Sequence, residues 1–306
     1  MRTKKEKKEE VQMSLDKVVA IDCGGTNLRV AVVDKDLNVL AVRRVPSLAN
    51  NPHKLYETML LLIKEVMRET KMEDVPSIGM SMCGMVVHNK VGRVGNLGIE
   101  GGYDFESLFK QDFPKAKLYF ANDANCSALV EAEYGVNKGL LDSAFVTIST
   151  GIGLGIIHNG EMIDLPLEGG RLITDYKDTQ YEVEYLLSGN GIIHLAALND
   201  YSISSAKEFF DAVRVRDPKA MHVYDIWSRL LGRWFGNMQL LFDCQQYAVS
   251  GGVMKSGDLW VNDVERIANA YVAPWRLNRI ILKEAKFSQD VGIAAAGALA
   301  WHALKK

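Results

Sequence analysis

The residues from Asp22 to Thr26 combine the groups that a phosphate-binding turn needs, and they lie between two apolar runs. The adjacent Gly24 and Gly25 let backbone N–H groups approach an anion without a Cβ in the way. Thr26 adds a hydroxyl group, and Asp22 can hold a water molecule that is bound to Mg²⁺. We therefore predict a loop that binds the phosphates of a nucleotide. An ordinary hairpin turn is the alternative, because glycine and aspartate are also common in such turns.

A second glycine-rich turn follows the same plan in the other half of the chain. Thr150, Gly151 and Gly153 stand between the apolar runs 144–148 and 154–157. Each of the two regions has the pattern of a strand, a glycine-rich turn and a returning strand. Two copies of one hairpin, far apart in the sequence, indicate a duplicated domain. The duplication predicts a two-lobed fold that presents one phosphate loop from each lobe toward a shared cleft.

Asp123 follows a strand pattern at 117–121 and stands near the start of a helical pattern that runs from Asn122 to Glu133. A carboxylate at such a junction is held rigidly and can accept a proton from a hydroxyl group. If that hydroxyl group belongs to a polyol, Asn122 can both donate a hydrogen bond to the polyol and accept one from it. Helix capping is the alternative, because Asn and Asp are among the commonest N-cap residues.

The elements that must position these residues alternate between strand and helix. Beyond the two hairpins, strand patterns cover 38–45, 77–82, 246–250 and 279–282, and helical patterns begin at 52, cover 181–242, begin after 256 and cover 292–304. Ser256 is the expected cap of the helix that follows it. The alternation predicts an α/β protein with a mostly parallel or mixed sheet.

The composition is that of an ordinary globular chain and narrows the possible partners. The 306 residues suffice for two lobes with cores of their own. A formal net charge of −2 argues against nucleic acid or an anionic membrane as the main partner. No apolar run is long enough to span a bilayer or resembles a secretion signal. The cysteines have neither metal-ligand spacing nor a disulfide framework, so we expect a cytoplasmic protein with reduced thiols.

Several short motifs come in a fixed order along the chain. They are the Asp-x-Gly-Gly-Thr turn at Asp22, Asn96-Leu97-Gly98, Asn122-Asp123-Ala124-Asn125, Thr150-Gly151-Ile152-Gly153, Leu167-Glu168-Gly169-Gly170 and Ser250-Gly251-Gly252. In this order and at these spacings they resemble the ROK family, which is named for repressor, open reading frame and kinase. The resemblance covers nearly the whole chain, from Val18 to about Trp301.

The resemblance implies the actin-like ATPase fold, a duplicated ribonuclease H-like α/β fold of two lobes with a cleft between them. We expect the lobes to be residues 1–121 and 122–289, with a helix at 290–306 packing back on the first lobe. The resemblance also implies transfer of the γ-phosphoryl group of ATP to a hexose or an N-acetylhexosamine, as in the glucokinase-like members of the family. ATP and Mg²⁺ would be the cofactors.

Roles for single residues follow from the resemblance by position. Asp123 would be the general base that deprotonates the sugar hydroxyl. The phosphate-binding residues would be Asp22, Gly24, Gly25, Thr26, Thr150, Gly151 and Gly153, with Gly251 and Gly252 beside the adenosine and with Mg²⁺ held through water by Asp22. The sugar-binding residues would be Asn96, Asn122, Asp123, Glu168 and Glu184.

The chain departs from the family pattern where the resemblance implies a structural zinc ion. The positions of the zinc-binding His and three Cys hold Arg171, Asp175, Lys177 and Glu182. We therefore expect no structural zinc. Arg171 has two interpretations. It contacts the sugar, either by donating hydrogen bonds or by binding an anionic group, or it forms an ion pair on the surface.

An ATP-dependent sugar kinase is thus the leading hypothesis, and two others compete with it. The missing zinc module raises the possibility of a catalytically weak protein that binds sugar or nucleotide. A transcriptional repressor is disfavoured, because only about seventeen residues precede the first loop, many of them charged and without a helical pattern, which is too few for a helix-turn-helix domain. The resemblance also implies a possible homodimer.

Overall fold

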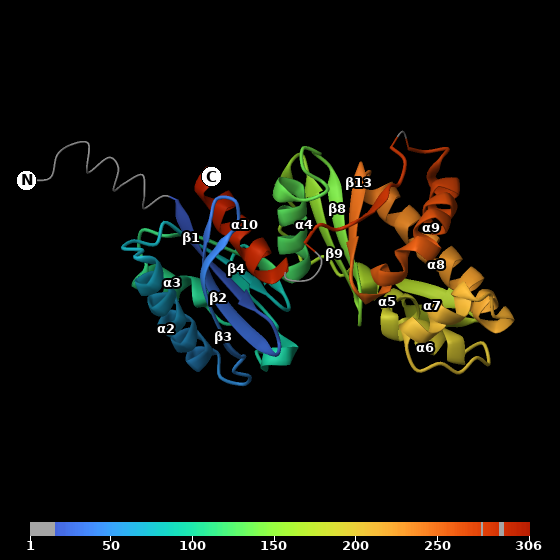
Figure 1. Cartoon of the computed structure of the whole chain (residues 1–306), viewed down its shortest axis with the longest axis horizontal. Coiled ribbons are helices and arrows are strands. Elements are labelled where there is room, and N and C mark those ends of the chain that lie inside the picture. Colours follow the sequence, from blue (N-terminus) through green and yellow to red (C-terminus); the bar gives the residue numbers. More distant parts are fainter. Residues whose placement is uncertain (1–15, 277, 288–290) are drawn as a thin grey trace, which may run out of the picture. The chain divides into compact units, whose positions relative to one another are not determined.

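The computed structural model describes residues 16–276, 278–287 and 291–306, which form two compact units (Figure 1). The first unit contains the described residues up to Val130, the short segment Asp164–Pro166 and the C-terminal helix. The second unit contains Glu131–Ile163 and the described residues from Leu167 to 287.

A five-stranded mixed sheet organises the first unit, with the strand order β3-β2-β1-β4-β7. The strands are β1 (Lys17–Cys23), β2 (Asn27–Asp34), β3 (Val39–Pro46), β4 (Ser77–Met82) and β7 (Lys117–Asn122). The first three are antiparallel neighbours, whereas β4 pairs in parallel with both β1 and β7. Every residue of β4 is buried. Burial on both faces is typical of a strand that helices cover on each side.

Alternate residues of β1 face two different helices. Val19 and Ile21 belong to a core cluster that includes α2 (Pro52–Thr70), whereas Val18 and Ala20 pack with α10 (Val291–Lys305). The approach of α10 to the sheet is close, because a Cβ at Gly79 would overlap the carbonyl oxygen of Ala296. The Ala-rich face of the predicted C-terminal helix thus lets it lie directly on β1 and β4.

The second unit repeats the same sheet, with the order β10-β9-β8-β13-β14. Its strands are β8 (Ser143–Ile148), β9 (Ile152–His158), β10 (Glu161–Met162), β13 (Gln246–Ser250) and β14 (Leu282–Glu284). Again the first three are antiparallel neighbours, and the last two continue the sheet in parallel. The predicted duplication and the predicted mixed α/β architecture are therefore confirmed.

Helices pack on this second sheet, and large aromatic side chains fill the core that they share with it. They are α5 (Val183–Leu187), α6 (Gly189–Ala197), α7 (Ala206–Arg214), α8 (Pro218–Phe242) and α9 (Gly257–Val272). Trp227 of α8 meets Trp260 of α9 edge to face, with ring centroids 5.7 Å apart. Both indole rings are fully buried. Such pairs add to the free energy gained by burying their area.

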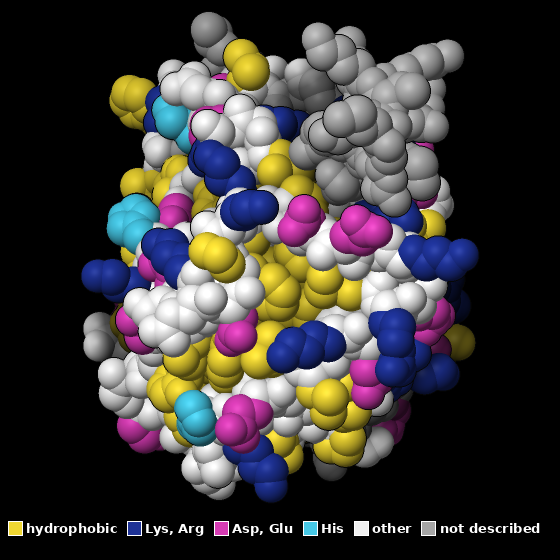
Figure 2. Space-filling view, turned by 90° about the vertical axis from the view of Figure 1, so that its left-hand side faces the viewer, with side chains coloured by type: hydrophobic (Ala, Val, Ile, Leu, Met, Phe, Trp, Pro, Cys, Tyr) yellow, Lys and Arg dark blue, Asp and Glu magenta, His cyan; other side chains and the backbone are white. Residues whose placement is uncertain are grey.

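The remaining elements are short or lie in the connections. They are α3 (Phe105–Asp112), α4 (Asp123–Tyr134), β5 (Val86–Val87), β6 (Lys90–Val91), β11 (Ile173–Tyr176), β12 (Thr179–Glu182) and the 3₁₀ helices η1 (Gly95–Leu97), η2 (Gly169–Arg171) and η3 (Gly252–Ser256). Figure 2 shows one face of the molecule, on which exposed hydrophobic side chains lie among charged ones. No helix of the described residues is both long and apolar enough to cross a membrane.

Three predictions about these elements were wrong in detail. Tyr181 and Glu182 were predicted as helical but lie in β12, which pairs with β11 through a turn with left-handed backbone at Lys177 and Asp178. The side chain of Ser256 makes no capping hydrogen bond, although it stands at the N-cap position of α9.

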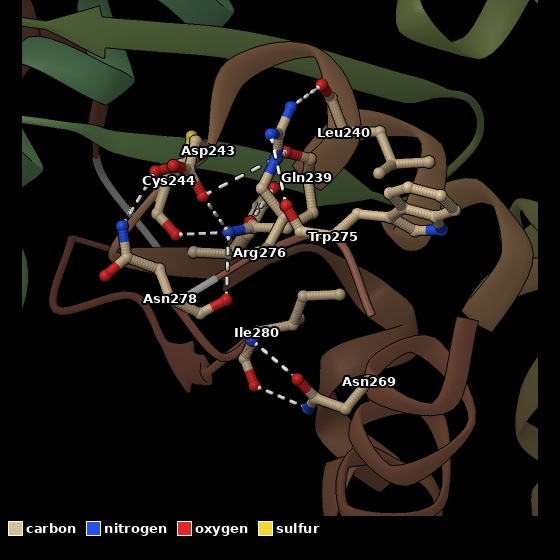
Figure 3. Close-up of polar contacts among 10 residues, drawn as sticks. Gln239, Leu240, Asp243, Cys244, Asn269, Trp275, Arg276, Asn278 and Ile280 are labelled. Carbon is tan, nitrogen blue, oxygen red and sulfur yellow. Dashed lines mark hydrogen bonds and ion pairs between the residues drawn. The ribbon is translucent and has the colours of Figure 1, made fainter. Parts of the chain in front are cut away.

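The last strand begins at Leu282 and not at 279, because a side chain forms hydrogen bonds with the backbone groups of the residue at 280. Asn269 of α9 accepts a hydrogen bond from the backbone N–H of Ile280 at 2.9 Å and donates one to its carbonyl oxygen at 3.0 Å (Figure 3). Both backbone groups of Ile280 are therefore engaged by one amide, and the ladder with β13 starts two residues later.

Arg276 closes the C-terminal end of α8 in the same region (Figure 3). Its guanidinium group donates hydrogen bonds to the carbonyl oxygens of Gln239, at 3.3 Å, and of Leu240. The last carbonyl groups of a helix have no partner within the helix, and a cation interacts favourably with them.

We expect Arg276→Ala to lower the free energy of unfolding by about 0.5–1.5 kcal/mol, because it removes these bonds and their charge. Urea unfolding would measure the change. Arg229→Ala is the matched control, because it removes an exposed pair with Asp225 in the middle of the same helix. An equal loss in both variants would contradict a capping role for Arg276.

Candidate functional site

The first glycine-rich turn joins β1 and β2 as predicted, and its aspartate is paired across the hairpin. Asp22 lies opposite Arg29 in the strand register. Oδ2 of Asp22 is 2.7 Å from both Nε and Nη2 of Arg29. Asp22 has a side chain only 16% exposed, so the ion pair is partly shielded from water. Sequence reasoning missed Arg29, although a tight hairpin after Asp22 places the residue seven positions later beside it.

A hollow of about 400 Å³ lies at this turn within the first unit. It is lined by Asp22, Gly24, Gly25, Thr26, Asn27, Arg29 and Arg44. Two arginines therefore join the predicted phosphate-binding residues in one concave surface. Guanidinium groups and backbone N–H groups are the donors that bind phosphate oxygens.

Two other parts of the first unit approach the turn closely. A Cβ at Gly25 would lie 2.8 Å from Cβ of Asn96, so the predicted sugar-binding Asn96 lies beside the first glycine-rich turn. A Cβ at Gly292, in the first turn of α10, would lie 2.5 Å from each carboxylate oxygen of Asp22. The carboxylate of Asp22 thus lies against the N-terminal turn of a helix, where a negative charge is stabilised.

Asp123 stands at the junction of β7 and α4, as predicted, and its side chain is exposed. Its Oδ1 accepts a hydrogen bond from the backbone N–H of Ala124 at 2.9 Å. Oδ1 of Asn122 accepts one from the backbone N–H of Asn125 at 2.9 Å. Asn122 therefore caps α4, which was the alternative interpretation for this pair. Its capping bond fixes the backbone from which Asp123 extends.

The two aspartates lie at the same edge of the sheet. Cys23 at the end of β1 is in register with Met82 of β4, and Met82 is in register with Asn122 of β7. Burial raises the pKa of the Cys83 thiol to about 11, with the charges of Asp123 and Asp22 adding to the effect. The charges of both carboxylates therefore act on the thiol of Cys83, which lies near both of them. Ligands of α/β sheets bind at this carboxyl edge of parallel strands.

In the second unit, the second glycine-rich turn borders a cavity of about 610 Å³. Ser149 and Thr150 line it together with Gly252, and α6 and α7 supply most of the other lining residues. Gly251 has φ of +99°, and a Cβ there would overlap the carbonyl oxygen of Ile148. The structure thus brings the late Ser-Gly-Gly motif to the second turn. Gly153 is not among the lining residues of this cavity, and it pairs with Thr147 in the sheet.

Glu184 joins three parts of the second unit. Its Oε2 accepts a hydrogen bond from the backbone N–H of Ile152 at 3.1 Å. A Cβ at Gly151 would lie 2.6 Å from this oxygen, and one at Gly170 would lie 3.0 Å from it. The side chain therefore fits between two glycines of separate motifs. Glu168 precedes η2, is exposed, and accepts through its carbonyl oxygen the backbone N–H of Arg171.

Arg171 forms ion pairs with two glutamates. Its Nη1 is 2.5 Å from Oε2 of Glu182 and 3.2 Å from Oε1 of Glu184. The hydrogen bond to Glu182, followed by the charge of Glu184, raises the pKa of the guanidinium group above its usual value. Of the two interpretations of Arg171, the structure shows the ion pair, whereas contact with a sugar stays a prediction.

The residues at the expected zinc positions do not fit that ion. Arg171 and Lys177 are cationic, and Lys177 donates a hydrogen bond to the carbonyl oxygen of Leu198 at 2.5 Å. Zinc ligands are thiolates, imidazoles and carboxylates. Within the described ranges, no group of three or more His, Cys, Asp or Glu side chains is placed to hold a metal ion. That the protein holds no zinc stays a prediction.

The predicted sugar-binding residues fall in both units. Asn96, Asn122 and Asp123 belong to the first, and Glu168, Arg171 and Glu184 belong to the second. Each unit also has one of the two glycine-rich turns that were predicted to bind phosphate. One mixed sheet that occurs twice, each time with a glycine-rich turn between its first two strands, defines the actin-like class of α/β ATPase folds.

Comparison with known proteins identifies the family. Residues 18–166 and 180–303 match the sequence model of the ROK family, and the chain belongs to that family. The predicted resemblance is thereby confirmed. The match is interrupted over 167–179, the segment that holds Glu168, Arg171 and β11.

Similar proteins cover almost the whole chain. An N-acetylmannosamine kinase of Salmonella newport is 25% identical over 92% of this chain and 97% of its own length. A ROK hexokinase from Thermus thermophilus has a similar structure, with a TM-score of 0.79, 22% identity, and coverage of 94% and 99%. A ROK glucokinase from Streptomyces griseus, in complex with glucose and AMPPNP, gives a TM-score of 0.68 at 21% identity with the same coverage.

Proposed function

We propose that this protein is an ATP-dependent sugar kinase that phosphorylates a hydroxyl group of a hexose or a hexose derivative. The observation that carries the proposal is the exposed carboxylate of Asp123 at the same sheet edge as the Asp22–Thr26 turn. Membership of the ROK family and the sugar kinases among similar proteins support it. The protein therefore combines a base for a hydroxyl group with a surface for phosphates.

In this mechanism Asp123 accepts the proton of the sugar hydroxyl while the hydroxyl oxygen attacks the γ-phosphorus atom. The bond between that phosphorus and the bridging oxygen to the β-phosphate breaks, and ADP leaves. Asn96 and the amide nitrogen of Asn122 orient the sugar. Arg29 and Arg44 lie in the hollow of the first turn, where they neutralise phosphate charge.

The remaining groups would bind the adenosine, Mg²⁺ and further sugar hydroxyls. The cavity of about 610 Å³ beside Thr150 and Gly252 has the size of a small-molecule pocket and would hold the adenosine. Asp22, already paired with Arg29, would hold Mg²⁺ through a bound water. When bound, Mg²⁺ neutralises charge on the phosphates. Glu168 and Glu184 would accept hydrogen bonds from further sugar hydroxyls.

Release of ADP from Mg-ATP tests the proposal. We expect release that depends on one sugar in a panel of hexoses, N-acetylhexosamines and acidic sugars, with a sugar phosphate as the product in ³¹P NMR. ATP binding without turnover on any sugar would contradict a kinase and favour the catalytically weak binding protein. A homodimer and a cytoplasmic location stay predictions, of which light scattering tests the first.

We expect the preferred substrate to be an uncharged sugar and not a sugar acid. Arg171 is the cation beside the predicted sugar-binding Glu184, and two carboxylates already neutralise it. Bringing a third carboxylate, on the substrate, close to these glutamates would add repulsion. Comparing kcat/KM for glucose and glucuronate, and for N-acetylmannosamine beside them, measures this preference. A higher kcat/KM for the acid would contradict it.

A further inference from the structure

An arginine and two glutamates form a small charged network in the second unit, and the arginine lies in the segment where the match to the family model is interrupted. Arg171 belongs to η2, Glu182 ends β12, and Glu184 lies in the first turn of α5. Arg171 therefore links η2 by ion pairs to β12 and to α5. It does so at two of the positions where the family resemblance implies zinc ligands, Arg171 and Glu182, whose charged atoms are 2.5 Å apart.

The network includes Glu184, whose carboxylate is closely packed between two glycines. Glu184 lies between Gly151 and Gly170, at distances that no larger residue at either position would allow without a shift. Its Oε2 receives the backbone N–H of Ile152, at the start of β9 and directly after the second phosphate turn. Its Oε1 faces Arg171 at 3.2 Å. A change in the rotamer of Glu184 would therefore be felt in the Thr150–Ile152 turn.

We propose that Arg171 is a positioning residue, which holds Glu184 against the second phosphate turn and so performs with ion pairs the cross-linking that a zinc ion would otherwise perform. Glu182 orients the guanidinium group, and Arg171 in turn orients the carboxylate that receives the sugar. The proposal deepens the proposed function on which its sugar-binding part rests. Its structural part concerns Glu184 and Ile152 alone.

Arg171→Met tests the proposal, because it keeps the length of the side chain and removes the charge. We expect the KM for the sugar to rise about 1.5-fold to fivefold, as the loss of a partly exposed ion pair predicts, while the KM for ATP stays unchanged. Raising the salt concentration should raise the sugar KM of the wild type and leave that of the variant unchanged. Glu182→Gln should give a smaller change in the same direction.

Hydrogen exchange supplies a readout that does not depend on activity. In Arg171→Met the amide of Ile152 should exchange about 1.5-fold to fivefold faster, because its acceptor loses its orientation. Arg229→Met, which removes an exposed pair with Asp225 in the same unit, is the control and should change neither the exchange of Ile152 nor the sugar KM.

The two readouts separate the possible failures. Unchanged exchange at Ile152 in a folded Arg171→Met variant overturns the positioning role, and a raised sugar KM together with unchanged exchange assigns Arg171 to direct sugar contact instead. Faster exchange with an unchanged sugar KM overturns the link to the sugar. If the wild type phosphorylates no sugar while exchange accelerates in the variant, the proposed function fails and the positioning of Glu184 stands.

Discussion

Asp123→Asn is expected to lower kcat by about 10² to 10⁴, the usual contribution of a general base. The KM for ATP and the affinity for the sugar should change little. An asparagine keeps the size of the side chain, and its Oδ1 can still accept the backbone N–H of Ala124, so the start of α4 is preserved. What it loses is the ability to accept the proton of the sugar hydroxyl. Steady-state kinetics and calorimetric titration of the sugar measure the two quantities separately.

Asp104→Asn provides the matched control for this variant. Asp104 is also an exposed aspartate at the start of a helix, where its Oδ1 accepts the backbone N–H of Ser107 at 2.9 Å. It lies outside the proposed site, so its replacement should leave kcat unchanged. If the two variants have the same kcat, Asp123 is only a residue of the helix start and the proposed mechanism is wrong.

Gly292→Ala is expected to lower kcat/KM for Mg-ATP by about 10²-fold, the effect of misplacing a catalytic group by about 1 Å. The new Cβ would lie 2.5 Å from the carboxylate oxygens of Asp22, so that carboxylate must move away from α10. Its pairing with Arg29 would be disturbed with it. The helix itself gains from alanine, by about 1 kcal/mol in intrinsic propensity. Activity should therefore fall without a matching loss of thermal stability.

Steady-state kinetics of the Gly292→Ala variant over a range of Mg²⁺ concentrations measures kcat/KM for Mg-ATP. A thermal melt of the same variant measures its stability. Gly101→Ala is the control, because a Cβ there meets no atom within 4 Å and the residue lies away from the hollow. Wild-type kinetics in Gly292→Ala would show that the carboxylate of Asp22 tolerates displacement, and would remove it from the proposed phosphate site.

Much of the fold could be predicted from local patterns. Alternating or continuous apolar residues around Gly24–Gly25 and around Gly151–Gly153 predict the two hairpins, because a strand and a tight turn are each specified within a few residues. The helical pattern predicts α4 to within one residue of its start, and capping of that helix was the alternative interpretation for Asn122 and Asp123. The shifted start of β14 could not be predicted, since it depends on the side chain of Asn269 engaging Ile280 from another element.

The sequence by itself thus determined the repeated strand–turn–strand units, the family resemblance and the place of Asp123 at a strand–helix junction. Only the tertiary structure decided which partners the charged residues have. Asp22 lies against Gly292 at the far end of the chain, and Glu184 fits between Gly151 and Gly170 beside Arg171. The physical reason is that turn and strand preferences act between neighbours in sequence. The partner of a charge or the space around a glycine is fixed only when distant segments pack together.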